Sequence, residues 1–310
     1  MDYDDVSEEL RPAGTASTAA RPRALIVTIY GLYARSAGGW LGVSTLIRLM
    51  GRLGVEEPAV RSSISRLKRR GILEPERRDG TAGYALSAHA RAILDEGDRR
   101  IFDRPRGTLD DGWVLAVFSV PESERGKRHA LRSRLTWLGF GTVGPGVWIA
   151  PGHLEAETRD AIDRDGLADY VDLFHADYRG FASLPAEVAH WWDLDELGGL
   201  YAEFTRGQAP VLAGWRRRRG RDDAGEAFAD YVRVLTAWRR LPYLDPGLAA
   251  EQSRVRWIRG REDAAGVPAG LDLRRERWGL RQHGAGQGDG AEQGRDVHGC
   301  GETEDSVPSW

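Results

Sequence analysis

Between residues 58 and 71, small hydroxyl and cationic side chains recur at the spacing of one helical face. The set consists of Arg61, Ser62, Ser65, Arg66, Lys68 and Arg69. Short side chains let a helix enter the major groove of DNA, and arginine can bond a guanine edge or a phosphate. No acidic residue stands within the set. The pattern predicts the reading face of a DNA-recognition helix.

The remaining residues of this stretch must hold the helix against a core. Val60, Ile64 and Leu67 recur on the opposite face, which is the pattern of an amphipathic helix. Helical spacing of apolar residues predicts two further helices upstream, over about 22–36 and 43–53. A short turn that contains a glycine separates the second of these from the recognition helix. Two helices joined in this way indicate a helix-turn-helix.

A β-hairpin is predicted directly after the recognition helix. Two short apolar stretches flank Asp79-Gly80, a strong signal for a tight turn between strands. Arg77 and Arg78 lie near the tip, where they would contact backbone phosphate as a wing does. Ser87 is expected to cap a further helix after the hairpin. We therefore predict a winged helix-turn-helix domain over residues 21–106. Two alternatives stay open: a winged helix that contacts protein, and a basic face that is merely solvated.

The distribution of charge supports a polyanion partner for this region. Residues 21–106 hold 17 Arg and Lys against 9 Asp and Glu, a net charge of +8, whereas the whole chain carries −3. A basic module on an acidic body attracts phosphates to the module.

Strand and helix signals alternate after this module. Apolar strands are predicted over 113–120, 147–149 and 171–174, with helices after Pro121 and over 155–164. A β-α-β-β-α-β order is typical of a ferredoxin-like sandwich. The segment that follows is helical and rich in Trp and Arg. The predicted fold class is α+β.

Five segments are expected: a disordered tail (1–20), the winged helix (21–106), a ferredoxin-like domain (107–182), a helical domain (183–270) and a second disordered tail (271–310). The first residues are acidic and lack the apolar core of a signal peptide. The most apolar stretch, 24–34, is about half of the roughly 20 residues that a membrane span needs. We expect a cytoplasmic protein that contacts no membrane.

Catalytic and metal-binding patterns are missing from the sequence. Its single cysteine, Cys300, cannot form an intramolecular disulfide, and the seven histidines are scattered. The sequence contains no P-loop, no G-x-S-x-G and no HExxH. We expect no enzymatic activity, no metal and no cofactor.

The sequence resembles the PaaX family, the repressors of phenylacetic acid degradation operons. The N-terminal resemblance rests on WLGVSTLIRLMGRLGVEEPAVRSSISRLKRRGIL, and the central one on GWVLAVFSVPESERGKRHALRSRLTWLGFGTVGPGVWIAP. In the C-terminal part it rests on DLDELGGLYAEF and AFADYVRVLTAWRRLPYLDPGL. The resemblance implies a homodimer that binds operator double-stranded DNA and is released by an aryl-CoA or acyl-CoA thioester such as phenylacetyl-CoA.

The central domain of that family resembles the small ferredoxin-like nuclease subunit of CRISPR adaptation complexes. Those nucleases place an Asp at the end of the first strand, where it holds Mg²⁺. Here the corresponding stretch is Ser119-Val120-Pro121, and the first acid is Glu122. The resemblance therefore implies an inactive domain; a divergent metal-dependent nuclease is the alternative.

A CoA ester carries phosphates and an apolar acyl group, so its site needs arginines beside aromatic side chains. The best candidates in the sequence are Trp238, Arg239 and Arg240, and the pair Trp191-Trp192 is a second choice. A homodimer is also expected because one short helix contacts too few base pairs for the specificity of a repressor.

Overall fold

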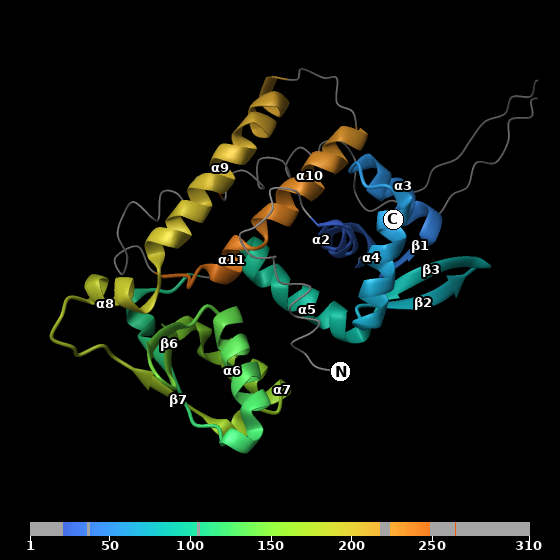
Figure 1. Ribbon diagram of the computed structural model, residues 1–310. Helices are drawn as coiled ribbons and strands as arrows, with labels where there is room; N and C mark the ends of the chain where they lie inside the picture. Colours follow the sequence, from blue (N-terminus) through green and yellow to red (C-terminus); the bar gives the residue numbers. More distant parts are fainter. Residues whose placement is uncertain (1–20, 36–37, 104–105, 218–223, 249–263, 265–310) are drawn as a thin grey trace, which may run out of the picture.

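The computed structural model describes residues 21–35, 38–103, 106–217, 224–248 and 264 (Figure 1). The chain forms an N-terminal unit of helices with a small sheet, a central unit with a four-stranded sheet, and a set of C-terminal helices. The mixed helix and sheet content agrees with the predicted α+β class. Both predicted disordered tails, 1–20 and 271–310, lie outside the described residues.

The helices of the N-terminal unit lie close to their predicted positions. They are α2 (Pro22–Ile29) with a π-helical turn (Tyr30–Ala34), α3 (Val43–Arg52), α4 (Glu57–Arg69) and α5 (Ala88–Asp98), which continues into a second π-helical turn (Arg99–Asp103). Ser87 begins α5, because its Oγ accepts a hydrogen bond of 3.1 Å from the Ala90 amide. This cap was predicted and is confirmed.

Three antiparallel strands complete the N-terminal unit. They are β1 (Trp40–Gly42), β2 (Leu73–Arg78) and β3 (Thr81–Leu86), in the order β1-β3-β2. The predicted hairpin is confirmed: Arg78 pairs with Thr81, and both Asp79 and Gly80 have positive φ, as a tight hairpin turn requires. Strand β1 was not predicted, because three residues carry too short a pattern to recognise.

The central unit has the predicted β-α-β-β-α-β order. Its elements are β4 (Trp113–Phe118), α6 (Arg125–Trp137), β5 (Gly141–Gly144), β6 (Val147–Pro151), α7 (Glu155–Arg164) and β7 (Val171–Ala176). The sheet order β5-β6-β4-β7 places the first and third strands side by side at its centre. The sequence Gly-Thr-Val-Gly of β5 has a weak strand propensity, so this edge strand was not placed in advance.

Four helices form the C-terminal part: α8 (Leu184–Trp191), α9 (Leu194–Arg217), α10 (Ala224–Trp238) and α11 (Leu241–Leu244). They do not form a domain of their own. Phe228, Ala229 and Val232 of α10 share one core with α2, α3 and α4, whereas Tyr231 and Trp238 share another with α9. Figure 1 shows α10 lying directly beside α2. The predicted boundary at residue 183 thus does not separate two independent cores.

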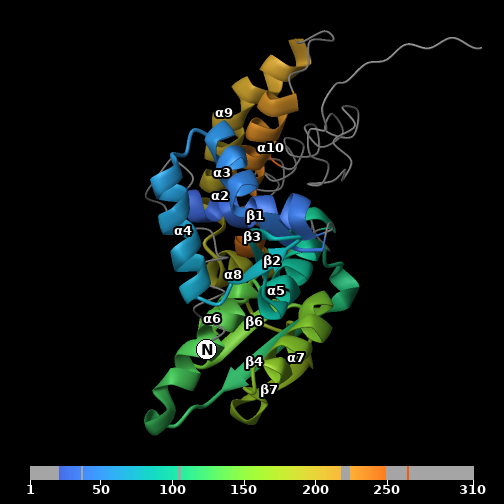
Figure 2. The same ribbon diagram turned by 90° about the vertical axis from the view of Figure 1, so that its right-hand side faces the viewer.

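Two buried arginines join the N-terminal unit to the central one. Arg100, from the turn after α5, donates to the carbonyl oxygens of Trp137 and Leu138 at 3.2 and 2.8 Å. Arg134 of α6 makes an ion pair with Asp165 at 2.6 Å, and a second with Glu96 of α5 at 3.6 Å. Because buried charges are stable only when paired, these contacts fix α5 against α6. Figure 2 shows α5 lying between the small sheet and the central unit.

Among the described residues, no helix is both long enough and apolar enough to cross a bilayer.

A glycine-to-alanine change tests the packing of the hairpin. A Cβ at Gly83 would overlap the Trp40 ring and the Leu41 carbonyl oxygen across the sheet. We expect Gly83→Ala to lower the free energy of unfolding by about 1–3 kcal/mol, as overpacking does. Gly51→Ala is the matched control, since a Cβ there meets nothing within 4 Å and alanine favours a helix. Chemical denaturation measures both; equal stability of the two variants would contradict this packing.

Candidate nucleic-acid interface

The rotation of α4 about its axis is set by its buried residues. Val60, Ile64 and Leu67 are buried in the N-terminal core, as the helical pattern predicts. Ser63 is buried with them, which the pattern did not indicate. All six residues predicted on the outward face are exposed: Arg61, Ser62, Ser65, Arg66, Lys68 and Arg69. The structure therefore brings the predicted set together on one solvent-facing surface of α4, which we call the α4 face.

The cations of the α4 face are not equivalent. Arg61 makes an ion pair of 2.7 Å with Glu57, one turn earlier, so an acid does border the face. Both partners are more than half exposed, and such a pair contributes little stability. Within the described part of the chain, no hydrogen bond or ion pair holds the side chain of Arg66, Lys68 or Arg69. These three side chains can therefore contact a polyanion without first breaking an interaction within the described part of the protein.

Arg77 and Arg78 of the hairpin point to opposite sides, because side chains alternate along a strand. Arg78 makes an ion pair of 2.5 Å with Glu76, donates to the Gly38 carbonyl oxygen at 3.3 Å, and lies 5.5 Å from the Trp40 ring centroid. Arg77 is exposed, and its side chain makes no hydrogen bond or ion pair among the described residues. The two were predicted to act alike, but Arg78 holds the hairpin to β1 and Arg77 alone projects freely.

Sequence reasoning missed three residues of the N-terminal unit. Arg48 and Arg52 are exposed on α3, one turn apart. The signal was present, because the apolar face that places Leu46 and Met50 in the core also turns these arginines outward. Trp40 is the third: its Nε1 donates to the Glu76 carbonyl oxygen at 3.2 Å and its ring lies beside Arg78. Nothing local in the sequence connects it to the hairpin.

Helix α2 supports the α4 face from behind. The Tyr30 hydroxyl donates to the Tyr84 carbonyl oxygen of β3 at 2.9 Å. Burial raises the pKa of Tyr30 well above its usual range, so the hydroxyl keeps its proton and the bond persists at any physiological pH. The hairpin and α4 are therefore mounted on one rigid core.

The residues predicted to contact an effector lie elsewhere. Trp238 is 2% exposed and its Nε1 donates to the Ile101 carbonyl oxygen at 3.3 Å, while Arg239 is 6% exposed and donates to the Ala24 carbonyl oxygen at 3.4 Å. Only Arg240 is partly exposed. This burial is at odds with direct contact to a ligand from solvent. Trp191 and Trp192, the second choice, are also buried, and they pack against Trp113.

The end of the first central strand offers no carboxylate free to hold a metal. Glu122, the first acid after β4, makes an ion pair of 3.0 Å with Arg128. Arg128 also donates to the Val120 carbonyl oxygen at 2.8 Å. Across the described residues, no group of three or more His, Cys, Asp or Glu side chains could hold a metal ion.

Comparison with known proteins assigns the chain to a family. Three family models match in order: a PaaX-like protein over residues 21–90, the PaaX protein central Cas2-like domain over 106–188, and the PaaX-like protein C-terminal domain over 192–265. The chain belongs to the PaaX family, as its motifs predicted.

One relative and one solved structure are similar to the chain. The transcriptional repressor PaaX of Escherichia coli K12 is 25% identical over 236 residues, which are 75% of this chain and 74% of the relative. A solved structure, the uncharacterized protein Rv0674 from Mycobacterium tuberculosis, is 21% identical with a TM-score of 0.49. The match covers 84% of this chain and 99% of that one.

The unequal roles of the two hairpin arginines are testable. Arg77→Ala should weaken binding to any duplex DNA about equally and reduce the salt slope by about one unit, since one phosphate contact is lost. Arg78→Ala should instead lower the free energy of unfolding by about 1 kcal/mol or less, because it detaches the hairpin from Trp40. Fluorescence anisotropy at several salt concentrations and thermal unfolding measure these effects. The assignment is wrong if the two variants exchange phenotypes.

Proposed function

We propose that this protein is a DNA-binding transcriptional repressor of a catabolic operon for phenylacetate or a related aromatic compound. Its N-terminal unit acts as a winged helix-turn-helix: α4 is the recognition helix and the β2–β3 hairpin is the wing. The observation that carries the proposal is the α4 face, whose hydroxyl and cationic residues are all exposed beside a hairpin that presents Arg77. Membership of the PaaX family and the likeness to a transcriptional repressor support it.

The side chains suggest a division of labour on DNA. Ser62 and Ser65 are short enough to let α4 approach the base edges, and Arg66 and Arg69 are long enough to read them. Arg77, from the hairpin, and Arg48, from α3, would contact phosphates on either side of the groove. Phosphate contacts position the protein, and base contacts give the sequence preference.

Two alternatives make different predictions. A winged helix that serves only protein contacts would show no salt-dependent affinity for DNA, whereas neutralised phosphates produce a steep salt dependence. A divergent nuclease would need a metal-binding carboxylate at the end of β4, and Glu122 is paired with Arg128 there. Sequencing of genomic fragments bound by the purified protein decides between a repressor and either alternative, because a repressor selects fragments upstream of one operon.

A homodimer and an acyl-CoA effector belong to the same proposal. Two α4 helices related by a two-fold axis would read two half-sites about one helical turn of DNA apart. The effector would release DNA by binding the DNA-free conformation more tightly. Arg239 joins α10 to α2 and thereby the C-terminal helices to the N-terminal core, so it would transmit the effect without contacting the ligand.

The recognition role of α4 can be measured at one residue. Arg69→Ala should cost about 1–3 kcal/mol of operator binding and relax the sequence preference, because an arginine that bonds a base edge is lost. Arg179→Ala removes the same charge from an exposed site in the central unit and should leave binding unchanged. Binding is measured by anisotropy on selected and scrambled duplexes. A loss that is equal on both duplexes would remove α4 from the reading role.

The effector mechanism requires reciprocal coupling. If a CoA ester lowers operator affinity by some factor, operator DNA must lower affinity for the ester by the same factor. We expect calorimetry with phenylacetyl-CoA to give a larger dissociation constant when operator is present, and free phenylacetate to bind far more weakly. Ester binding that is indifferent to DNA would exclude this mechanism while leaving DNA recognition intact.

A further inference from the structure

We propose that a cavity at one end of the central sheet binds an organic phosphate with a planar ring, the chemistry of a nucleotide. If the proposed effector mechanism holds, the nucleotide part of the CoA thioester enters this cavity. This link to the effector rests on the proposed function. The ring would lie between Phe118 and Trp148, and the phosphate would contact Arg132 and Arg128.

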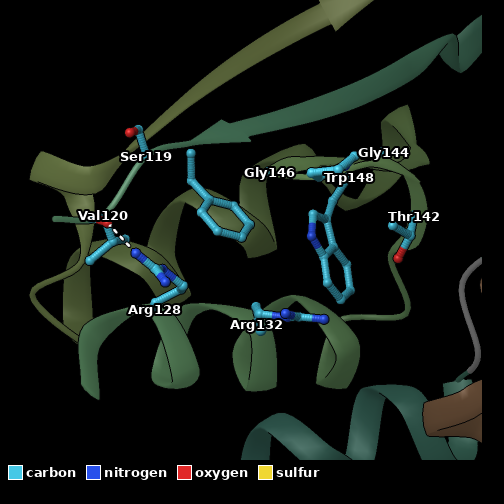
Figure 3. A pocket seen from close by; sticks show the side chains of 10 residues that line it. Ser119, Val120, Arg128, Arg132, Thr142, Gly144, Gly146 and Trp148 are labelled. Atoms are coloured by element: carbon cyan, nitrogen blue, oxygen red, sulfur yellow. Dashed lines mark hydrogen bonds between the residues drawn. The ribbon is translucent and has the colours of Figure 1, made fainter. Parts of the chain in front are cut away.

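The cavity has the size of a ligand site. Its volume is about 620 Å³, within the usual range for small-molecule pockets. It lies where the end of β4, the turn between β5 and β6, and the first half of α6 come together (Figure 3). Its walls are formed by Phe118, Ser119, Val120, Arg128, Arg132, Thr142, Gly144, Pro145, Gly146 and Trp148.

Two aromatic side chains form the apolar part of the cavity. Phe118 is the last residue of β4 and Trp148 belongs to β6, and both line the cavity. Trp148 points from the sheet toward α6 (Figure 3). Aromatic faces on two sides of a space favour a planar ring, which can stack or pack edge to face.

The charged part of the cavity is entirely positive. Arg128 and Arg132 lie one turn apart on α6 and face the cavity below the aromatic rings (Figure 3). Arg128 is oriented by the Val120 carbonyl oxygen and by Glu122, which partly offsets its charge. Arg132 is exposed, and within the described residues no hydrogen bond or ion pair holds its guanidinium group. A planar guanidinium that is not already paired suits a phosphate group.

Helix α6 itself adds no negative charge near these two arginines. It contains no acidic residue, although Glu122 and Glu124 precede it. No lining residue of the cavity is acidic. The cations here repel a metal ion and attract an anion.

Helix α6 connects the cavity to the rest of the molecule. Its first half carries Arg128 and Arg132, and its second half carries Arg134 and Trp137. Arg134 pairs with Glu96 of α5, and the Trp137 ring stacks on Tyr243 at 3.8 Å between centroids. A ligand that draws Arg132 toward the cavity thus acts on the helix that contacts both the N-terminal unit and α11. This gives the proposed effector a physical route to the DNA-binding face.

The experiment is calorimetry of the full-length chain with ADP, coenzyme A, phenylacetyl-CoA, adenosine and inorganic phosphate. We expect the phosphorylated nucleosides to bind and adenosine and inorganic phosphate to bind at least tenfold more weakly. Arg132→Ala should weaken nucleotide binding about tenfold or more, the effect of one lost charge-assisted hydrogen bond. Lys127→Ala is the matched control on the same helix outside the cavity and should change affinity less than about twofold. Both substituted residues are exposed. Thermal unfolding of each variant tests whether it still folds.

The outcomes separate this proposal from the repressor function. If none of the nucleotides binds, or if Arg132→Ala binds them as tightly as the unchanged protein, the cavity is not the site. If ADP binds through Arg132 but the CoA compounds do not, the cavity is a nucleotide site and its link to the effector is wrong.

If the CoA ester binds through Arg132, anisotropy should show that Arg132→Ala still binds operator but is no longer released by the ester. Absence of DNA binding by the unchanged protein would refute the repressor function and leave the cavity result standing.

Discussion

The packing of α10 against α2 is the contact on which the rest of the structure depends. Every residue of α2 from Leu25 to Ile29, and Tyr30 after it, is buried, so the helix needs partners on all sides. Helix α10 provides one side through Phe228 and Val232, and the Thr236 hydroxyl donates to the Thr28 Oγ at 2.8 Å. A segment about two hundred residues later in the chain therefore completes the core that supports α4. The N-terminal unit therefore shares its core with a C-terminal helix and is not a separate module.

This arrangement gives the molecule two connections between its regions. One is the shared core of α2 and α10, where Arg239 reaches the Ala24 carbonyl oxygen. The other is the junction of α5 with α6, where Arg100 donates to the Trp137 and Leu138 carbonyl oxygens and Arg134 pairs with Glu96. Removal of one partner from such a buried pair typically costs about 3–5 kcal/mol, so the junction is stiff. A shift of α6 must therefore be followed by α5 or must break these pairs.

Arginine has three different roles in this chain, and sequence spacing does not distinguish them. Arg134 is buried in ion pairs, and Arg78 and Arg128 are oriented by neighbouring oxygens. The side chains of Arg69, Arg77 and Arg132 are exposed and have no partner among the residues that the structure describes. The difference depends on which acids and carbonyl groups the fold brings near. The third kind is the informative one, because a cation without an internal partner is available for a phosphate from outside the protein.

The sequence by itself determined the local structure. Spacing of Val60, Ile64 and Leu67 predicted the outward face of α4, Asp79-Gly80 predicted the hairpin, and Ser87 predicted the start of α5, because periodicity, turn chemistry and caps are local interactions. Only the tertiary structure decided which apolar faces meet and what each polar group touches. It buried Trp238 and Arg239, which the sequence had suggested for contact with a ligand. It also placed Arg78 against Trp40 while Arg77 stays exposed, and it assembled the cavity around Arg132. An apolar stripe shows that a face is buried but does not name its partner, because burial of apolar surface is non-directional.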